Sequence, residues 1–321
     1  MKRRCCILYN EPAPGAGPDE MDVLDQVGLV EEQLQKLGLE VYRIGIGTDF
    51  MDKITSLLHN PPDFVFNLVE SINNQGKLVY FAPALLGQNG FRYTGCPVEA
   101  IFITSNKKLA AKFMELGGIP VPESVRPDEI RRLHFGRKYI IKPLWEDGSA
   151  GITAESVFTY SPGDEPRIAG LRPDVWFIEE FIDGREFNIS IFSGPDGPVV
   201  LPPAEIEFIN FGPGRPKIVD YKAKWEPDSF EYRNTVRVFP KDMCGTMAGE
   251  KLSAICRDTW NLLGLRGYAR IDIRCNSAGD PFVLEVNANP CISPDSGFIA
   301  ACSEAGYELT EVFGNIINDL N

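Results

Sequence analysis

Residues 267–290 read GYARIDIRCNSAGDPFVLEVNANP, and this stretch decides the fold. Apolar and polar residues alternate on both sides of NSAGDP, a run of residues that favour turns, so we expect two antiparallel strands joined by a turn. A turn centred between the alanine and the glycine of this run places Asp272 opposite Glu285. By the same count, the next polar pair along the strands is Arg270 and Asn287.

The polar face of this hairpin is the main clue to function. Side chains alternate with period two along a strand, so the four polar residues project from one side of the hairpin. The other side is apolar and suits burial; it carries Ile271, Ile273, Leu284 and Val286. A turn shifted by one residue would break the facing pairs and leave the alternation within each strand intact.

Two directly facing carboxylates are costly unless a cation lies beside them. Their Cβ atoms are roughly 5 Å apart in an antiparallel pair. Their repulsion at about 4 Å is on the order of 1 kcal/mol in water and roughly 4 kcal/mol at an effective dielectric constant of 20. Asp272, Glu285 and Asn287 offer hard oxygen ligands suited to Mg²⁺ that also holds phosphates, and Arg270 would stabilise charge that develops nearby. The alternative is a hairpin whose polar face is only solvated surface.

A second segment, YIIKPLWEDGSAGI, has the features of a phosphate-binding loop. Lys142 ends an apolar strand, and the loop after it contains Gly148, Ser149, Ala150 and Gly151. Such small residues let backbone N–H groups approach an anion. Neither a Walker A loop nor a G-x-G-x-x-G fingerprint is present in the sequence. By itself the segment is equally consistent with a surface turn.

Two further segments carry weaker signals. FIEEFIDGREFNIS places Glu179 and Glu186 on either side of a turn, which on its own indicates an acidic hairpin. VDYKAKWEP is interpreted as a strand with Lys222 and Lys224 on one face, a pattern typical of a solvated sheet edge.

Composition excludes several classes of function. Asp and Glu number 45 against 32 Lys and Arg, a net charge of −13 that opposes general nucleic-acid binding. The only histidines, His59 and His134, are expected to be surface or structural residues, which argues against Ser-His-Asp, Cys-His and histidine-rich metal chemistry. No apolar run is long enough to span a membrane, and the eight cysteines form no C-x-x-C pair, so we expect reduced thiols in a cytoplasmic protein.

The 321 residues suggest two domains, or three small ones that share a site. Strands and helices alternate over residues 1–104, which predicts an α/β domain with a parallel sheet. We expect a central lobe at 105–187, opening with a helix whose candidate N-cap is Ser105, and a C-terminal lobe at 188–321. The C-terminal lobe is expected to hold further strands, a helix near 241–263 and a C-terminal helix.

Taken together and in this order, IIKPLWEDGSAGI, EEFIDGREFNIS, YKAKW and RIDIRC…FVLEVNANP resemble the ATP-grasp superfamily, most closely its D-alanine–D-alanine ligase-like branch. The resemblance covers about two-thirds of the chain. It implies an α/β fold, α+β in part: a parallel-sheet N-terminal domain and two α+β lobes that sandwich ATP.

The resemblance also implies roles for individual residues. Lys108 matches the first ATP-contacting lysine, although the adjacent Lys107 leaves the register open. The other nucleotide-binding positions are Lys142, Gly148, Ser149, Ala150, Gly151, Glu179, Glu180, Phe181, Glu186 and Lys224. The implied magnesium ligands are Asp272, Glu285 and Asn287, and the implied catalytic residues are Arg270, Lys142 and Lys224.

Both substrate pockets depart from the family pattern. The N-terminal loop is NEPAPGAGPDEMD, the family's histidine-glycine segment is replaced by NLVESINNQGK, and the residues after the metal asparagine include NPCISPDSGF. The candidates for holding the substrates are Glu11, Asp19, Glu20, Glu70, Ser293 and Ser296. The catalytic frame therefore matches the family, while specificity for D-alanine does not follow from the sequence.

The expected activity is that of an ATP-dependent carboxylate–amine ligase that works through an acyl phosphate. It would use ATP with two Mg²⁺ ions, for which Mn²⁺ could substitute, and small carboxylate and amine substrates such as amino acids or short peptides. The amine could instead belong to a protein terminus or another small molecule. A different class remains open: an ATP-binding regulatory or scaffold protein without turnover. The resemblance further implies a homodimer.

Overall fold

The computed structural model describes residues 2–146, 148–243 and 245–321. Its N-terminal part is built on a parallel sheet of strand order β2-β1-β3, which confirms the predicted parallel pairing. The strands are β1 (Arg4–Asn10), β2 (Glu40–Ile46) and β3 (Phe64–Leu68). Nearly every residue of β1 and β3 is buried, because helices cover both faces of the sheet.

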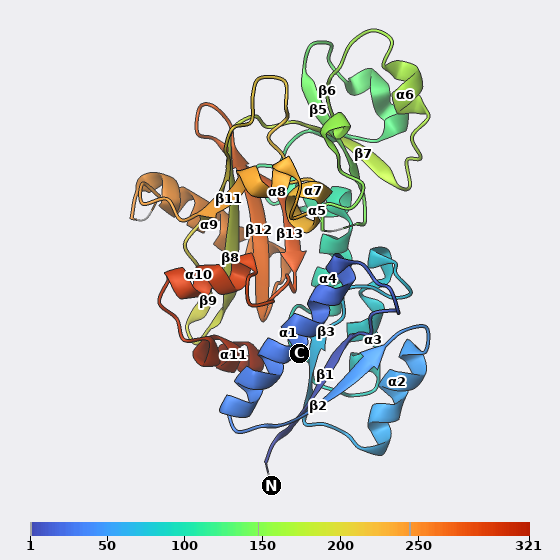
Figure 1. The fold of residues 1–321 in the computed structure, drawn as a ribbon, viewed down its shortest axis with the longest axis vertical. Coiled ribbons are helices and arrows are strands. Elements are labelled where there is room, and N and C mark those ends of the chain that lie inside the picture. The colour runs from blue at the N-terminus through green and yellow to red at the C-terminus, as the bar shows by residue number, and fades with distance from the viewer. Residues whose placement is uncertain (1, 147, 244) are drawn as a thin grey trace.

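The two faces of this sheet pack in separate apolar clusters. One face of β1 meets α1 (Pro18–Lys36) and α11 (Leu309–Asn318), which lie side by side in Figure 1. The other face meets α2 (Phe50–Ser56) and α3 (Phe81–Gln88). The C-terminal helix therefore closes the N-terminal core, and the first and last parts of the chain form one packed unit.

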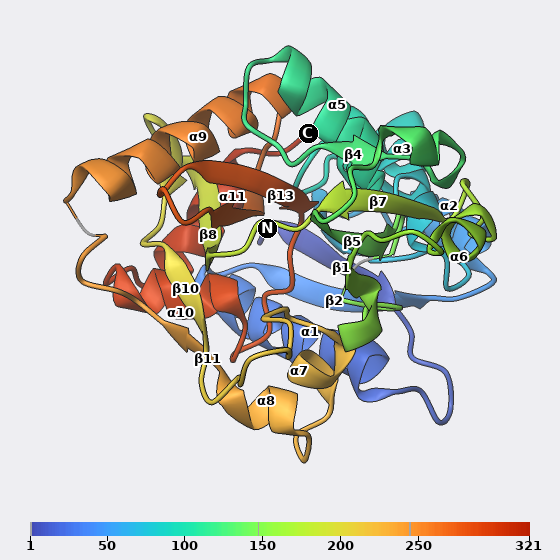
Figure 2. The ribbon, with the colours of Figure 1, turned by 90° about the horizontal axis from the view of Figure 1, so that it is seen from above.

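The C-terminal sheet is antiparallel and has the order β11-β10-β8-β12-β13, with β9 paired to the free part of β8. Its strands are β8 (Arg185–Gly194), β9 (Gly197–Val200), β10 (Ala204–Phe208), β11 (Thr235–Val238), β12 (Tyr268–Cys275) and β13 (Pro281–Ala288). Its apolar face packs against α4 (Val98–Ser105), α5 (Lys107–Leu116) and α9 (Met247–Leu263). Figure 2 shows α9 and α5 on this side of the sheet and α10 (Gly297–Glu304) on the other.

A smaller antiparallel sheet, of order β4-β7-β5-β6, forms the lobe at the upper right of Figure 1. Its elements are β4 (Ser124–Val125), β5 (Lys138–Pro143), β6 (Val157–Thr159), α6 (Glu165–Ala169) and β7 (Trp176–Glu180). The helix α5, expected at the start of this lobe, packs on β13 of the C-terminal sheet instead. Within the predicted range 105–187, the segment that forms this sheet therefore begins after α5.

The facing pairs of the hairpin were predicted correctly, although the turn was not. Asp272 lies opposite Glu285 and Arg270 opposite Asn287. The turn is one residue shorter than predicted, and the register shifts between Asp272 and Ile273 at a β-bulge that restores the predicted pairing. The predicted burial of Leu284 is wrong, because the bulge brings Val283 into the core in its place.

Local capping also differs from the sequence prediction at one helix. The side chain of Asn106, and not that of Ser105, accepts a hydrogen bond from the backbone N–H of Leu109 and caps α5. Ser105 is the last residue of α4, a helix that the sequence analysis did not identify. Two consecutive helices, α10 and α11, replace the single C-terminal helix that was expected.

The expectations about histidine and cysteine agree with the structure. His59 and His134 are exposed. Seven cysteines within the described ranges are free thiols, and Cys244 lies outside those ranges. None of the described helices combines the length and the apolar character that crossing a membrane requires.

Candidate functional site

The polar face predicted for the hairpin extends over a third strand. β8 pairs antiparallel with β12, so that Glu186 lies opposite Arg274, Asn188 opposite Asp272 and Ser190 opposite Arg270. The alternation in REFNISIF places these polar residues on the face of β8 that joins the polar face of β12. Three neighbouring strands thus present one continuous polar surface, backed by an apolar core.

Asp272 is the centre of this surface. One of its carboxylate oxygens accepts hydrogen bonds from Arg270 Nε and Asn188 Nδ2, both at 2.8 Å. The other accepts from Arg270 Nη2 at 2.8 Å and from Asn287 Nδ2 at 3.1 Å. Burial raises the pKa of Asp272, and the Arg270 guanidinium opposes that rise. The two-bond contact with Arg270 fixes the orientation of both side chains.

Glu285 is surrounded by cations. Its Oε2 lies 3.5 Å from Lys107 Nζ. Burial alone would raise the pKa of Glu285, but Lys107, Lys142 and Lys224 hold it well below its usual range. Because three lysines converge on one carboxylate, this end of the surface has positive charge available for an anionic ligand such as a phosphate chain.

The donor set fits a hard divalent cation. Among the described residues, no three His, Cys, Asp or Glu side chains gather to hold a metal on their own. The candidate set is instead two facing carboxylates, Asp272 and Glu285, with the amide of Asn287 beside them. Such a set suits Mg²⁺, which usually keeps water and phosphate oxygens in its remaining positions.

The lysine at the end of β5 is buried and paired. Lys142 Nζ lies 2.6 Å from Glu179 Oε2 on the neighbouring strand β7. Burial raises the pKa of Glu179, and Lys142 lowers it. Lys107 links this region to the hairpin, because its Nζ contacts both Glu285 and the carbonyl of Glu146 in the loop after β5. Two residues predicted separately thus form one ion pair at the site.

The predicted loop Gly148–Gly151 is in contact with the C-terminal lobe. Gly148, Ser149 and Gly151 all have positive φ, between 64° and 75°. Ser149 Oγ donates to the carbonyl of Val219 at 2.7 Å, and Trp225 Nε1 donates to the carbonyl of Gly148 at 3.2 Å. The loop is therefore held in place on both sides.

The segment that carries Lys224 is a helix, so its interpretation as a strand is wrong. It forms α7 (Tyr221–Trp225), followed by α8 (Phe230–Asn234). The side chain of Asp220 accepts from the backbone N–H of Ala223 and caps α7. Residues two positions apart lie about 200° apart around a helix, so Lys222 and Lys224 do not share a face.

Glu186, which the resemblance implies as a ribose ligand, forms a buried ion pair. Arg274 donates from Nε at 2.9 Å and from Nη2 at 2.6 Å, and both bonds reach Oε2 of Glu186. Arg274 also donates to the carbonyl of Ile182 and lies 4.8 Å from the centre of the Phe181 ring. Among the described residues, the hydrogen bonds to the Glu186 carboxylate reach Oε2 only, which leaves Oε1 as the oxygen for a ligand hydroxyl.

Glu180 and Phe181 lie at the end of β7 in different surroundings. Because strand side chains alternate, Glu180 projects opposite to Glu179 and lies 4.0 Å from Arg137. Phe181 is buried in a small apolar cluster with Ile140 and Ile218. The structure therefore separates Glu180 from the lysine cluster and places an aromatic ring beside Arg274.

The two adjacent lysines at the start of α5 point to different places. Lys108 Nζ donates to the carbonyl of Ser124 at 3.1 Å. Lys107 is buried, and its Nζ donates to the carbonyl of Glu146 at 2.8 Å while facing Glu285. The geometry favours Lys107 over Lys108 as the lysine of the site.

A second polar group lies between α1 and the loop after β13. The buried Gln26 donates from Nε2 to Glu70 Oε1 at 2.9 Å and to Asp22 Oδ2 at 3.2 Å. Its Oε1 accepts from the backbone N–H of Ile292 at 3.2 Å. Of the predicted acids, Glu70 thus joins this group, whereas Glu20 is exposed.

The other two predicted acids of the N-terminal loop have different partners. Glu11 is exposed, and its Oε2 accepts from the hydroxyl of Tyr9 at 2.7 Å. Asp19 approaches α7, where the hydroxyl of Tyr221 lies 3.5 Å from its Oδ1. Asp19 is therefore the acid of this loop that lies nearest to α7.

The loop after β13 contains the two predicted serines. Ser293 is buried, and its hydroxyl donates to Asp295 Oδ1 at 3.1 Å and lies 3.1 Å from Cys291 Sγ. Cys291 donates to Asp22 Oδ2 at 3.0 Å; burial raises its pKa to about 12, so the thiol stays neutral. Ser296 is the N-cap of α10. Ser293 therefore faces the group around Gln26, and Ser296 stabilises a helix.

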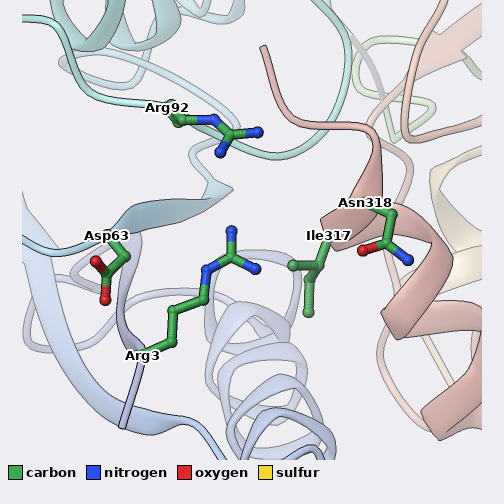
Figure 3. Close-up of a pocket in the computed structure, with 5 residues that line it drawn as sticks. All are labelled: Arg3, Asp63, Arg92, Ile317 and Asn318. Atoms are coloured by element: carbon green, nitrogen blue, oxygen red, sulfur yellow. The ribbon is translucent and has the colours of Figure 1, made fainter. Parts of the chain in front are cut away.

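A surface cavity lies away from this region. Figure 3 shows it between the beginning of β1 and the end of α11, lined by Arg3, Asp63, Arg92, Ile317 and Asn318. It lies at the amino-terminal edge of the parallel sheet, whereas Glu70 follows the opposite edge.

Comparisons with known proteins agree with this geometry. Residues 167–318 match the family model for the D-ala D-ala ligase C-terminus. A D-alanine–D-alanine ligase of Gloeobacter violaceus is 26% identical over 298 residues, which cover 90% of this chain and 91% of the relative. The chain is a D-alanine–D-alanine ligase-like ATP-grasp protein.

Solved structures show the same fold over the whole chain. The D-alanine–D-alanine ligase of Bacillus anthracis in complex with ATP has a TM-score of 0.73 at 18% identity, covering 99% of this chain and 97% of its own. VanG D-Ala:D-Ser ligase of Enterococcus faecalis has a TM-score of 0.72 at 16% identity, covering 99% of both chains. These likenesses show that the ligase-like protein has the fold of these enzymes over its whole length.

The sequence analysis missed several residues of this ligase-like protein. Arg274 and Asn188 alternate with apolar neighbours in strands that had been identified, so period two could have placed them on the polar face. Gln26 lies among apolar residues at helical spacing, and no local pattern distinguishes it from an ordinary buried amide. Its partners come from segments 44 and 266 residues away.

Proposed function

We propose that this chain joins the carboxylate of one amino acid or short peptide to the amine of another, with ATP as the energy source. The observation that carries the proposal is the polar surface of β8, β12 and β13, which faces Lys142 and the loop Gly148–Gly151. The reaction needs no nucleophilic side chain, so positioning and electrostatic stabilisation supply the rate.

Nucleotide binding is assigned to the cleft between the small sheet and the hairpin. The apolar cluster around Phe181 would hold the adenine, and Oε1 of Glu186 would accept from a ribose hydroxyl. Lys142 and Lys107 would contact the phosphates, with the backbone of the loop Gly148–Gly151 above them. In the relative from Bacillus anthracis, the solved complex contains ATP.

Magnesium would be held by Asp272, Glu285 and Asn287. When bound, Mg²⁺, or Mn²⁺ in its place, neutralises phosphate charge and aligns the phosphoryl group for transfer. The protein's own contribution is to keep Glu285 ionised through its three lysine neighbours and to fix Asp272 through Arg270. Both carboxylates are then in position before the nucleotide arrives.

The reaction follows in two steps. The substrate carboxylate attacks the γ-phosphorus of ATP, the bond to the β-phosphate oxygen breaks, and an acyl phosphate and ADP result. The amine, after losing a proton, attacks the acyl carbon, and inorganic phosphate leaves to give the amide. Arg270, whose guanidinium is held beside Asp272, would stabilise the oxyanion that forms at the acyl carbon.

The substrates are assigned by charge to the region around Gln26. Glu70 and Asp22 would attract the ammonium group of an amino acid, and Ser293 lies close by as a hydrogen-bonding hydroxyl. The relatives are named for D-alanine and, in one case, for D-alanine with D-serine. We therefore assign small amino acids in the D configuration as the first substrates to test. The homodimer and the cytoplasmic location stay predictions.

A substrate-dependent ADP-release assay tests this proposal. Each amino acid, in both configurations and in pairs, is added with ATP and Mg²⁺, and the condensed product is identified by its mass. We expect ADP in step with one amide product. Tight ATP binding without ADP release across the whole panel would overturn the proposal and favour a regulatory ATP-binding protein, the alternative that the family comparisons do not favour.

A further inference from the structure

Arg237 is a guanidinium that the proposed reaction does not yet use. It lies on β11, and its Nη1 donates to the carbonyls of Asp295 at 3.1 Å and Ser296 at 3.4 Å. These carbonyls belong to the loop after β13 and to the start of α10. The side chain is therefore fixed over the same loop that brings Ser293 and Cys291 toward the N-terminal domain.

The side chain of Arg237 is exposed, although its guanidinium lies against the loop after β13. Among the ion pairs of the described residues, within 4.0 Å, none involves this guanidinium. Burial lowers the pKa of Arg237 and the neighbouring Arg270 lowers it further, while Asp295 and Cys291 act in the opposite direction. Arg270 gives two hydrogen bonds to Asp272, so that carboxylate is already engaged. Arg237 and Arg270 thus repel each other, and an anion from a ligand would relieve that repulsion.

The position of Arg237 identifies which ligand supplies that anion. The phosphate chain is assigned to the lysines around Glu285. Arg237 instead approaches the loop that connects through Ser293 and Cys291 to Asp22, the side assigned to the amino acids. The amine substrate keeps its own carboxylate throughout the reaction, whereas the carboxylate of the other substrate is consumed. A permanent anion is therefore expected only on the amine substrate.

We infer that Arg237 binds the carboxylate of the amine substrate and restricts that substrate to amines that carry a carboxylate. This inference rests on the proposed function. Nη1 is fixed by two backbone carbonyls, and the remaining N–H donors of a guanidinium form a fork that matches a carboxylate. The side chain of Arg237 is exposed, so a ligand can reach it from solvent.

Binding measurements that do not require turnover test the inference. With a non-hydrolysable ATP analogue and Mg²⁺ present, titration calorimetry compares amino acids of both configurations with their carboxamides. We expect at least one amino acid to bind the unmodified protein ten times or more as tightly as its carboxamide. In Arg237→Met this preference should disappear, and in Arg237→Lys it should return in part. Absence of any such preference, or a preference that persists in Arg237→Met, would overturn the inference.

Two controls separate this role from a purely structural one. Arg233→Met removes an exposed arginine of α8 that pairs with Asp228, and should keep the full preference. If Arg237 only stabilised the loop, its replacement would weaken the amino acid and its carboxamide equally and would lower the thermal midpoint. ADP release is measured separately, so absence of turnover would contradict the proposed function, whereas turnover without the carboxylate preference would overturn this inference alone.

Discussion

The two halves of the site differ in how their charges are neutralised. On the nucleotide side, buried charges form ion pairs within the protein: Lys142 with Glu179, Arg270 with Asp272, and Arg274 with Glu186. On the amino-acid side, the carboxylate of Asp22 is contacted by the neutral amide of Gln26 and the neutral thiol of Cys291. Carboxylates pair with arginine or lysine in the first half, whereas Asp22 in the second half accepts hydrogen bonds from neutral groups.

This difference indicates how the two halves contribute to function. Ion pairs with two hydrogen bonds fix side-chain orientation, which suits phosphoryl transfer because its transition state is stabilised by charges already in place. Replacing one neutral amide, thiol or hydroxyl group by another leaves no buried charge without a partner. Under the proposed function, the paired half would set the reaction type and the half around Gln26 would set the choice of substrate.

The largest effect should come from removing a carboxylate of the paired half. Glu285→Gln keeps the shape of the side chain but removes its charge beside Asp272, and ADP release should fall by about 10³-fold or more. Asp280→Asn, in the exposed turn of the same hairpin, should keep the original rate. Normal turnover of Glu285→Gln would refute the metal assignment.

A buried ion pair should matter for stability as well as binding. Arg274→Met leaves Glu186 buried without its partner, and we expect the free energy of unfolding to fall by about 3 kcal/mol. Urea denaturation followed by circular dichroism measures this change. Arg172→Met breaks an exposed pair with Asp174 and should leave the unfolding midpoint unchanged. Equal midpoints for both variants would contradict the difference between buried and exposed pairs.

The adjacent lysines of α5 give an intermediate effect. Lys107→Met should raise the KM for ATP by about tenfold, the loss expected for one charge-assisted contact to phosphate, because Lys107 faces Glu285. Lys108→Met should change it less than twofold, since that side chain bonds to the carbonyl of Ser124. Steady-state kinetics with ATP as the varied substrate measures both KM values. A larger rise in Lys108→Met than in Lys107→Met would assign Lys108 to the site.

An effect of the same size should come from the half around Gln26, on a different substrate. Glu70→Gln should raise the KM of one amino-acid substrate by about tenfold and leave the KM for ATP unchanged, because only the ammonium contact is lost. Glu20→Gln, at an exposed position of the same domain, serves as the control. A change in the KM for ATP alone would contradict the assignment of Glu70 to the amino-acid side.

Much of the fold could be predicted because its signals are local. The alternation of β12 and β13 predicted the facing pairs, and the alternation of strands and helices over residues 1–104 predicted the parallel sheet. The turn was predicted one residue too long, and the bulge that adds Leu284 was not predicted. These two errors cancel at the facing pairs, so that only the burial of Leu284 was wrong. The prediction also failed at α7, because five residues with alternating lysines fit a strand as well as a single helical turn.

The site could be predicted in part for the same reason. Asp272, Glu285 and Asn287 lie in one hairpin, so a count along the chain brings them together. The choice between Lys107 and Lys108 depends on which side of α5 packs against β13, and this is a property of the assembled core. Two partners of Gln26, Glu70 and Ile292, lie in segments 44 and 266 residues away, and no spacing in the sequence relates them.

The sequence by itself determined the kind of chemistry, since residues close along one hairpin meet through the period of the strand and need no distant partner. Tertiary structure alone decided the balance of charges, that is, which buried charges pair with each other and which carboxylates meet neutral groups. That balance depends on contacts between segments far apart in the chain, such as Arg274 with Glu186 and Asp22 with Cys291. Long-range packing creates those contacts, and packing is not encoded by local periodicity.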